Sequence, residues 1–539
     1  MEKVVAIWLS AVLLVGPGAQ AAAAVTDMPS GWAKPALERM VKEGIMEGSD
    51  GRIYPERTLT RAEFAAMVSR VFGANRERDL SDFRDVDSGS WYAAPLARAV
   101  QMGMFQGDGV LLYPEHAVTR QEAFAALARV LELPDGDLSA LEGFSDVETV
   151  AAWAVPGVAA MASAGYIQGS QGRLLPQASM TRAEAAQLMS NLAERILGEE
   201  GNVSGVQVSG TVIIKASGVT LADTTVGGDL IIGDGVGDGD IALDGVTVQG
   251  RLIIRGGGEN SVHLQNSRVA GEVVVQNRNH PVRLALLGNS STGTIRVRSA
   301  LTLDGSADAL VLETAAPLTL GDGTVGSLVI TGSGAAVSLG QGARVTSLTA
   351  RGSAAVSGQG MIEQALVQAD QVQILAPVTR ILVDNGVTGT LAGNIPVAGG
   401  QTAAVDRNGV GRIIGGASSG GGASSGGEPG PSGETKTEGN WVSIEETGIV
   451  SVDFLRYAAV VLRQDAMGDA DFTQYTYYIN GVKQETGNDV TKVAVSADGQ
   501  LVIVKILLPN NAPTQLLRLV RGSEYMEIQL AGVGASVKK

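Results

Sequence analysis

Hydrophobic and polar positions change their spacing twice along the chain, which divides it into three patterned regions. From 25 to 198, apolar residues recur at helical spacing in short segments separated by glycine-containing loops. From 203 to 414 the helical spacing disappears, and short aliphatic triplets alternate with glycines and polar turns. From 440 to 539 the apolar runs are longer and have strand character. The pattern predicts a helical region, a repeating array of short strands, and a small all-β domain.

The helical region contains three copies of one unit. Each copy opens at a tryptophan, and a glycine, a proline and a Thr-Arg pair follow at the same spacing in all three. The common spacing assigns the copies to about 25–73, 80–133 and 142–198, and it predicts helix, glycine-broken loop, helix in each. We expect the second helices of the copies to end near Val71, Val130 and Ile196.

A Thr-Arg-x-Glu tetrad opens each of these second helices. Threonine at the helix N-cap with glutamate three positions later predicts a capping box, in which each side chain satisfies a free backbone N–H. The arginine has no such explanation, because a cation in the first turn faces the positive end of the helix dipole. Two explanations stay open: an external anion held by the guanidinium and the helix N–H groups, or an internal ion pair with Asp85 or Asp146. The arginines are Arg61, Arg120 and Arg182.

Short aliphatic triplets recur in the central region with a period of about 20 residues, which is typical of a solenoid. Between successive members of one series lies a second triplet. Two short strands per period predict a parallel β-helix of about ten coils over 203–414, with a β-sandwich or barrel as the alternative. The first series is Val212 to Ile214, Leu230 to Ile232, Leu252 to Ile254, Val273 to Val275 and Ile295 to Val297.

The segment 415–439 consists mostly of Gly, Ser, Ala and Pro and predicts a flexible linker to the last region. Four segments of 440–539 have strand character, and Asn480-Gly481 predicts a hairpin turn. We expect an immunoglobulin-like β-sandwich, whose tyrosines would suit binding if they are exposed. The four segments are Val450 to Leu455, Tyr475 to Ile479, Leu501 to Leu508 and Tyr525 to Leu530.

The segment 1–24 has the composition of a secretory signal peptide. Lys3 supplies a positive charge, Val4 to Val15 form an apolar run, and small residues follow Pro17-Gly18. The alternative, a membrane anchor, needs about 20 apolar residues. We therefore predict an exported protein.

Composition narrows the classes of function. The 539 residues include no cysteine, which excludes disulfides, thiolate zinc sites and cysteine nucleophiles. With 40 basic and 56 acidic residues the net charge is -16, which argues against general nucleic-acid binding. We expect no cofactor and no bound metal.

The motifs of the helical region resemble those of S-layer homology (SLH) domains. Phe83-Arg-Asp85-Val86 and Phe144-Ser-Asp146-Val147 precede the second and third tryptophans, and Gly-x-x-x-Gly loops start at Gly44, Gly103 and Gly165. The first copy departs from the pattern with Val25-Thr-Asp27-Met28, and the third has Leu175 where the others have tyrosine. The resemblance is confined to the segment 25–198.

The resemblance implies a mostly helical pseudo-threefold module that holds exported proteins on the bacterial cell wall without a covalent bond. Grooves between copies would bind a secondary cell wall polysaccharide, commonly through a pyruvate-ketal sugar. Arginine would hold the ketal carboxylate and tryptophan would pack on the sugar, although core anchoring is an equal alternative for the tryptophans. The implied binding residues are Arg61, Arg120, Arg182, Asp27, Asp85, Asp146, Trp32, Trp91, Trp153, Gly48, Gly107 and Gly169.

The helical region is itself acidic. The segment 25–198 holds 16 basic and 23 acidic side chains, a net charge of -7, so its overall field cannot attract an anionic polymer. Recognition would have to be local, through individual arginines, and would depend only modestly on salt.

Catalysis needs paired carboxylates or clustered acids, and the acidic residues of the central region mostly occur singly in turns. The exception is Asp234, Asp238 and Asp240, for which a solvated turn is a better interpretation than a calcium site. The sequence favours a non-catalytic protein of the bacterial cell surface with a wall anchor, a β-helical spacer and a terminal binding domain of unknown ligand. The alternatives are a wall-anchored polysaccharide-degrading enzyme and a lattice-forming S-layer subunit.

Overall fold

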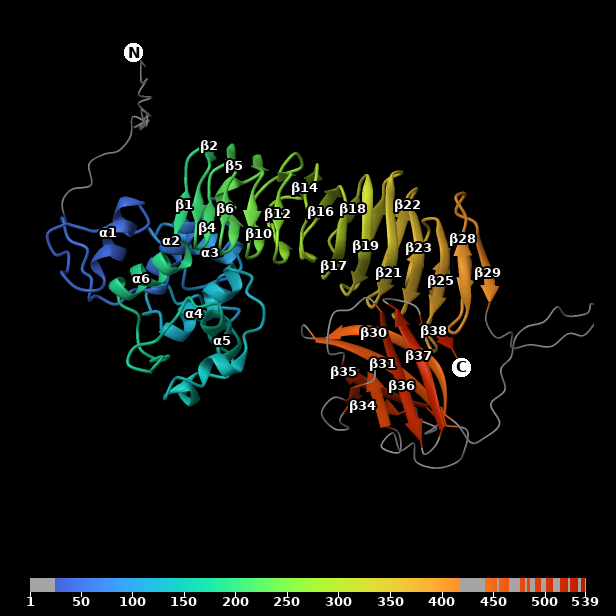
Figure 1. Ribbon diagram of the computed structural model, residues 1–539. Coiled ribbons are helices and arrows are strands. Elements are labelled where there is room, and N and C mark those ends of the chain that lie inside the picture. The colour runs from blue at the N-terminus through green and yellow to red at the C-terminus, as the bar shows by residue number, and fades with distance from the viewer. Residues whose placement is uncertain are drawn as a thin grey trace, which may run out of the picture. The chain divides into compact units, whose positions relative to one another are not determined.

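The computed structural model describes residues 25–415 and, further on, a set of strands between 442 and 538 (Figure 1). The predicted signal peptide and all of the predicted linker except Gly415 lie outside the described residues. The chain divides at about residue 420 into two units.

Six α-helices form three helix–loop–helix copies, as the repeat predicts. All three second helices begin at the tetrad arginine, with the capping box formed in each. The third ends at Leu192 rather than near Ile196, and Arg195–Leu197 is already a strand. The helices are α1 (Lys34–Lys42), α2 (Arg61–Phe72), α3 (Ala93–Gln101), α4 (Arg120–Val130), α5 (Val155–Ser163) and α6 (Arg182–Leu192), with 3-10 turns η1 (Leu138–Leu141) and η2 (Val147–Thr149).

A closed ring of backbone hydrogen bonds joins the three copies at their centre. Leu59 N–H donates to Met180 O at 2.9 Å, Met180 N–H to Val118 O at 2.9 Å, and Val118 N–H to Leu59 O at 3.0 Å. Each copy therefore donates to one neighbour and accepts from the other. The helical region is thus a pseudo-threefold module.

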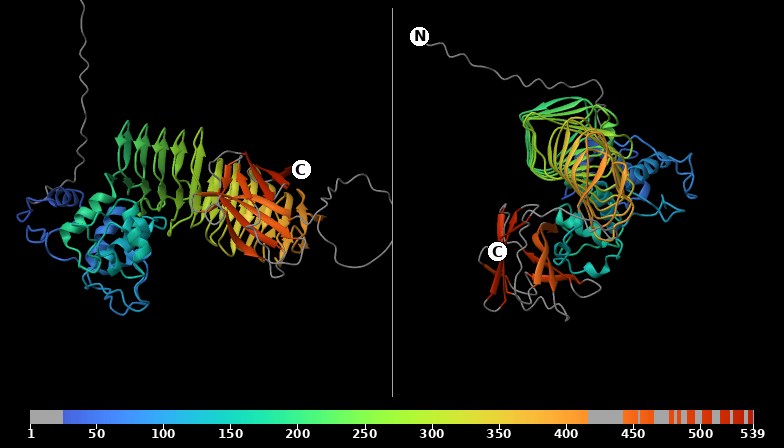
Figure 2. Two further views of the ribbon diagram at one scale, coloured as in Figure 1. Left: turned by 60° about the horizontal axis from the view of Figure 1, so that its bottom comes forward. Right: turned by 90° about the vertical axis from the view of Figure 1, so that its right-hand side faces the viewer.

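Beyond α6 the chain forms a parallel β-solenoid of about ten turns, whose coils stack along one axis (Figure 2). The two triplet series predict two sheets, and the structure has a first sheet of 13 strands and a second of 12. A third sheet of four two-residue strands, which the sequence did not predict, follows the second sheet in the early coils. The sandwich and barrel alternatives are wrong for this region.

The strands of the three sheets follow in spatial order. The first sheet holds β1 (Arg195–Leu197), β4 (Val212–Ile214), β7 (Leu230–Ile232), β10 (Leu252–Ile254), β13 (Val273–Val275), β15 (Ile295–Val297), β17 (Ala307–Leu312), β19 (Gly323–Ile330), β21 (Ala343–Ala350), β23 (Met361–Val367), β25 (Val378–Val383), β28 (Thr402–Val405) and β29 (Gly411–Gly415). The second holds β2 (Gly201–Ser204), β5 (Val219–Ala222), β8 (Ile241–Asp244), β11 (His263–Gln265), β14 (Val282–Leu287), β16 (Leu301–Asp304), β18 (Leu318–Leu320), β20 (Ala335–Leu339), β22 (Ala354–Gly358), β24 (Gln373–Ile374), β26 (Thr390–Ala392) and β27 (Ile395–Val397). The third holds β3 (Gln207–Val208), β6 (Thr225–Val226), β9 (Thr247–Val248) and β12 (Arg268–Val269).

The solenoid ends in antiparallel pairs. β28 pairs antiparallel with β25 and with β29, and β27 pairs antiparallel with β26. These reversals stop the parallel stacking and cover the last coil.

The helical module and the first coils share one hydrophobic core. In β4, β7 and β10 all three residues are buried, because the outer ones face the solenoid interior and the middle one faces the helices. The middle residues Ile213, Ile231 and Ile253 are 0% exposed and belong to the core of the helical module. Figure 1 shows the helices against this end of the solenoid.

The second unit contains two antiparallel sheets. Sheet order is β30-β31-β35-β34 in one and β33-β32-β36-β37-β38 in the other. Val450 to Leu455 is not one strand as predicted, because β30 ends at Val452 and β31 starts at Leu455 in the antiparallel direction. The strands are β30 (Val442–Val452), β31 (Leu455–Gln464), β32 (Thr476–Ile479), β33 (Val482–Gln484), β34 (Val490–Val495), β35 (Leu501–Leu507), β36 (Thr514–Arg521), β37 (Glu524–Ala531) and β38 (Ala535–Lys538).

The hairpin predicted around Asn480-Gly481 is supported by its flanking strands, since Ile479 pairs with Val482. The two turn residues lie outside the described part of the chain. The described part of the tail is thus all-β, and its immunoglobulin-like topology stays a prediction.

Candidate functional site

Three grooves lie between the copies of the helical module, and each takes residues from all three copies. We number them by the copy that supplies the loop glycine. Groove 1 holds Gly48, Glu63, Arg182 and Trp91. Groove 2 holds Gly107, Glu122, Arg61 and Trp153, and groove 3 holds Gly169, Glu184, Arg120 and Trp32. The structure thus brings the predicted tryptophans, arginines and glycines together in sets of three.

The tetrad arginines are held rigidly across the copy boundaries. Arg120 donates from Nε to Leu174 O at 2.7 Å and from Nη1 to Glu184 Oε1 at 2.7 Å. Arg61 makes the equivalent bonds to Leu112 O at 2.9 Å and to Glu122 Oε1 at 3.2 Å. Their side chains are only 12% exposed, so the guanidinium direction is fixed.

Arg182 makes the third of these equivalent sets of contacts, but its ion pair is longer. Its Nε donates to Ile53 O at 2.6 Å, and its Nη1 lies 3.8 Å from Glu63 Oε1. Burial lowers the pKa of Arg182, and the Glu63 carboxylate partly offsets this. The ring of three arginines and three glutamates therefore follows the same pseudo-threefold order as the backbone ring.

These contacts bear out the internal ion pair of the tetrad arginine. Its partner is an acidic residue, but the glutamate of the next copy's capping box and not Asp85 or Asp146. The glutamate uses both oxygens, since Glu184 Oε2 caps its own helix by accepting from Thr181 N at 2.8 Å while Oε1 accepts from Arg120. The sequence did not predict this second role, for which the recurrence of Glu63, Glu122 and Glu184 was the only signal.

The helix N–H groups are not free for an anion, contrary to one of the open explanations. Arg120 N–H donates to Ala178 O at 3.0 Å and Gln121 N–H to Pro176 O at 2.9 Å. The same pairs form at Arg61 and at Arg182. Together with the capping boxes they satisfy the first turn of each helix. Any anion in a groove must therefore bind side chains or loop amides.

The three aspartates stand behind the loops and do not line the grooves. Asp27 accepts from Ile53 N at 2.7 Å and Tyr54 N at 2.8 Å, and Asp146 accepts from Leu174 N and Leu175 N, both at 2.8 Å. Asp85 binds the equivalent amides, Leu112 N at 2.9 Å and Tyr113 N at 2.6 Å. The aspartates thus position the loops.

The second residue of each amide pair has left-handed backbone geometry. The φ angles are 52° at Tyr54, 56° at Tyr113 and 51° at Leu175, a conformation that costs a residue with a side chain about 1–3 kcal/mol. The aspartate bonds compensate for this strain. Burial acts to raise the pKa of Asp146, but the N–H donors of Leu174 and Leu175 outweigh it, so that the pKa lies below its ordinary value.

The groove glycines are required by close backbone approach. A Cβ on Gly48 would lie 2.2 Å from Arg52 O, and one on Gly107 would lie 2.4 Å from Leu111 O. A Cβ on Gly169 would lie 2.6 Å from both Arg173 O and the ring of Phe144. Gly107 and Gly169 also have φ angles of 64° and 67°. These loops therefore turn tightly at the groove edge.

The tryptophans are exposed, which excludes core anchoring as their role. Trp32, Trp91 and Trp153 are 63, 64 and 59% exposed. Each ring therefore offers an apolar face beside a groove that also presents a fixed guanidinium.

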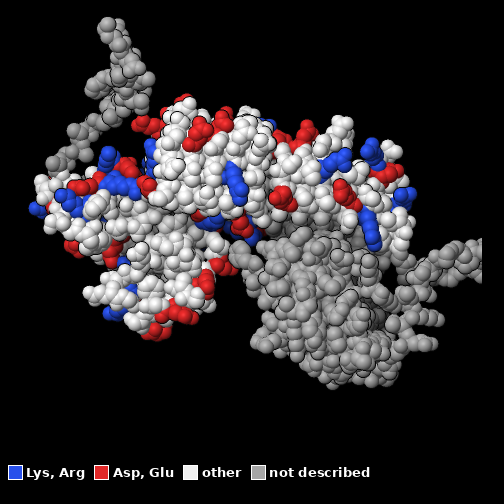
Figure 3. All heavy atoms as spheres, viewed as in Figure 1, with Lys and Arg blue, Asp and Glu red and all other residues white. Residues whose placement is uncertain are grey.

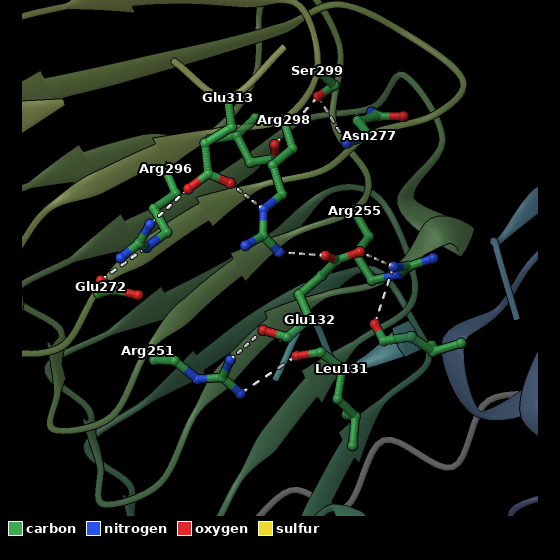
Figure 4. Close-up of polar contacts among 12 residues, drawn as sticks. Leu131, Glu132, Arg251, Arg255, Glu272, Asn277, Arg296, Arg298, Ser299 and Glu313 are labelled. Atoms are coloured by element: carbon green, nitrogen blue, oxygen red, sulfur yellow. Dashed lines mark hydrogen bonds and ion pairs between the residues drawn. The ribbon is translucent and has the colours of Figure 1, made fainter. Parts of the chain in front are cut away.

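A polar network, which the sequence did not predict, holds the helical module on the solenoid (Figure 4). Arg255 is 0% exposed and donates to Asp234 Oδ2 at 2.8 Å, to Val130 O at 3.0 Å and to Met102 O at 3.0 Å. Arg298 bridges the two parts by binding Glu132 Oε2 and Glu313 Oε2, both at 2.7 Å.

Asp234 is therefore not a solvated turn residue, because it is 4% exposed and paired with Arg255. Asp238 and Asp240 are not buried, in agreement with the prediction. Among the described residues no group of three or more His, Asp or Glu side chains is placed to hold a metal ion. In the same part of the chain, no helix has the length and apolar run needed to cross a membrane.

Charges of both signs are interspersed over the face drawn in Figure 3, and the described residues on that face form no continuous basic surface. This agrees with the net charge of the helical region. The grooves concentrate arginine locally instead.

Comparison with known proteins identifies the helical module. The family model of the S-layer homology domain matches 25–65, 82–124 and 143–186, so the chain carries three SLH domains. The amylopullulanase of Thermoanaerobacterium thermosulfurigenes is 34% identical over 175 residues, 31% of this chain and 9% of that protein. The surface-layer 125 kDa protein of Lysinibacillus sphaericus is 32% identical over 203 residues, 36% of this chain and 17% of that protein.

A cell-surface-expressed chitinase of Paenibacillus sp. strain FPU-7 also matches as a solved structure. Its TM-score is 0.16 at 17% identity, over 64% of this chain and 24% of the chitinase chain. The chain spans less than a fifth of the length of the two sequence relatives named above. The SLH domains and the S-layer relatives mark it as a cell-surface protein.

Proposed function

We propose that the protein attaches non-covalently to secondary cell wall polysaccharide through the three grooves of its SLH module. One observation carries the proposal: each groove combines an exposed tryptophan, a fixed arginine and a tight glycine loop from three different copies. Aromatic faces pack on the apolar faces of sugar rings, and guanidinium groups bind carboxylates.

The arginine geometry suits a sugar that carries a carboxylate. In Arg61 and Arg120, Nε and Nη1 are occupied by a loop carbonyl and a glutamate, which leaves Nη2 for the groove. A pyruvate-ketal sugar would place its carboxylate on this nitrogen and its ring on the tryptophan. The bound polymer would then span residues of all three copies.

The other regions extend this anchor. We assign the solenoid the role of a spacer and the terminal all-β domain, taken as immunoglobulin-like, the role of a binding domain that the linker tethers to it. The buried network around Arg255 supports a spacer that starts rigidly from the anchor. In this account the protein is not an enzyme.

Two alternatives follow from the relatives. Amylopullulanase is a polysaccharide-degrading enzyme by name, and the Lysinibacillus protein is a surface-layer protein by name. Release of reducing sugar from wall or plant polysaccharides by the full chain would favour the first. Ordered sheets in electron micrographs after removal of denaturant would favour the second.

The test is a pull-down of the full chain on purified cell-wall sacculi, with and without their secondary polysaccharide. The matched variant changes Trp32, Trp91 and Trp153 to alanine, because these exposed rings can be removed without opening the core. We expect the wild type to bind only sacculi that keep the polymer and the triple variant to lose most of this binding. Equal binding by the folded triple variant would contradict the proposal.

A further inference from the structure

The three grooves differ at one equivalent position. Arg70, Arg129 and Asn191 lie at the same separation in sequence from the tryptophan of their copy. Each donates to the equivalent backbone carbonyl: Arg70 Nη1 to Ile45 O at 3.2 Å, Arg129 Nη2 to Met104 O at 2.9 Å, and Asn191 Nδ2 to Tyr166 O at 3.2 Å. The structural role is thus kept in all three copies, while the positive charge is missing from the third.

In groove 1 the second arginine is already neutralised. Arg70 Nη2 lies 2.9 Å from Glu47 Oε2, and Arg57 pairs with Glu63. Arg182 shares the Glu63 carboxylate at 3.8 Å. Three cations and two carboxylates therefore line groove 1, which encloses about 250 Å³.

In groove 2 the second arginine has no carboxylate partner among the described residues. Asp108 is occupied by the Tyr113 hydroxyl at 2.5 Å and by two backbone amides, and Glu122 is occupied by Arg61 and its own helix cap. Desolvation and the charge of Arg61 both lower the pKa of Arg129, so the two guanidinium groups act on one another. Groove 2 is also the largest of the three, at about 540 Å³.

In groove 3 one cation remains, and it is paired. Arg120 binds Glu184 at 2.7 Å, and Asn191 Oδ1 accepts from Gln187 Nε2 at 2.8 Å. The groove encloses about 460 Å³, so its size does not prevent entry of a sugar. It differs from groove 2 in lacking a second guanidinium group rather than in volume.

We propose that the three grooves bind anions with unequal affinity and that groove 2 is the primary site for a sugar carboxylate. The residue at the position of Arg129, which is Asn191 in groove 3, determines this difference in affinity. This rests on the proposed function and adds an order of occupancy. Two guanidinium groups that line one groove, one of them without a carboxylate partner, favour a carboxylate between them, whereas a single paired guanidinium gains little. Groove 1 is intermediate, because its ligand must compete with Glu47 for Arg70.

Each groove carries its own tryptophan, which gives a readout for each site. The full chain labelled with 5-fluorotryptophan is titrated with the methyl glycoside of a hexosamine bearing a pyruvate ketal, and fluorine NMR follows Trp153, Trp91 and Trp32. Single Trp→Phe variants assign the resonances. We expect Trp153 to respond at the lowest concentration, about tenfold below Trp32, since each tenfold step corresponds to one charge-assisted contact of about 1.4 kcal/mol.

Two variants test the assignment to this position. Arg129→Gln should raise the glycoside concentration at the midpoint of the Trp153 response about tenfold. The midpoints of Trp91 and Trp32 should stay unchanged, and they show that the variant is folded. Asn191→Arg should lower the midpoint of Trp32. The carboxyl methyl ester of the glycoside has the same shape without the charge and should no longer prefer groove 2.

The outcomes separate this inference from the proposed function. If all three tryptophans respond at one concentration, or if Arg129→Gln leaves Trp153 unchanged, the order of occupancy is wrong while anchoring stands. If none responds to the glycoside and the sacculus pull-down also fails, the anchoring proposal is wrong and the order of occupancy falls with it.

Discussion

At the scale of single residues, each tetrad arginine has a structural role, to which the proposed function adds a binding role. Each stabilises the junction of two copies through a loop carbonyl and a glutamate, and the same contacts aim its remaining nitrogens at a groove. The ion pair also compensates for the unfavourable place of the cation at a helix N-terminus. A structural role and a binding role therefore do not exclude one another here.

Much of the candidate site could be predicted from the sequence, but not its internal partners. The capping boxes depend on local spacing, and the motifs named the tryptophans, arginines and glycines that the grooves collect. The partner of Arg61 could not be predicted, because Glu122 comes from another copy and only the threefold arrangement brings it near. Burial of Asp234 was missed for the same reason, since its partner Arg255 lies one coil later.

A buried ion pair should be far more sensitive to truncation than a half-exposed one. Arg255→Ala leaves the buried Asp234 without its cation and should cost about 3–5 kcal/mol in the free energy of unfolding. Arg283→Ala removes a half-exposed pair with Asp304 and should cost less than about 1 kcal/mol. Urea denaturation of the full chain measures both, and similar losses would contradict the role given to Arg255.

The loop aspartates should make the helical module sensitive to acid. The pKa of Asp146 is lowered in the folded state, so its contribution is present above its unfolded pKa of about 3.9 and is lost as the pH falls through the folded value. Asp146→Asn should be less stable than wild type at pH 6 and should lose less stability between pH 4 and 2.5.

Urea midpoints followed by tryptophan fluorescence over this pH range provide the measurement. Glu142→Gln changes an exposed carboxylate in the same copy and serves as the control, with the acid sensitivity of the wild type. An Asp146→Asn variant as acid-sensitive as wild type would show that this carboxylate does not hold its loop.

At the scale of elements, the aliphatic triplets contain two signals, their period along the chain and the absence of polar residues within them. A strand with one face in a solenoid core and the other in water alternates apolar and polar residues, whereas β4, β7 and β10 do not. The period predicted the solenoid. The second buried face was not predicted, although the missing alternation is its signal in the sequence. What covers that face could not be predicted, because helix-to-sheet packing leaves no spacing signal.

One row of outward-facing residues along the first sheet shows where the helical module stops covering the solenoid. Ile231 and Ile253 are followed in register by Val274, then by the half-buried Arg296 and Val311. The first three are buried and the row becomes accessible from β15 onward. The shared core therefore extends over the first coils only.

Placing a carboxylate in this core should uncouple the two parts. Ile231→Asp buries an unpaired charge and should lower stability by more than about 3 kcal/mol. Helical unfolding, followed by tryptophan fluorescence, should then precede solenoid unfolding, followed by circular dichroism, whereas the two coincide in the wild type. Val329→Asp, at a half-buried position of the same row, is the control and should leave the transitions together.

At the scale of the whole molecule, sequence and structure agree on a modular order but differ on how the modules meet. The repeats predicted an SLH region and a solenoid in series, and both are present. Their shared core makes the anchor and the first coils one folded body, so the anchor would set the direction of the spacer on the wall. The terminal domain is a separate unit.

Hydrogen–deuterium exchange of the full chain, with and without purified secondary cell wall polysaccharide, tests most directly where the polymer binds. It maps binding without choosing residues in advance. We expect protection of the groove loops around Gly48, Gly107 and Gly169 and no change over the solenoid from 203 to 415. Protection along a solenoid face, with the three loops unchanged, would contradict the account.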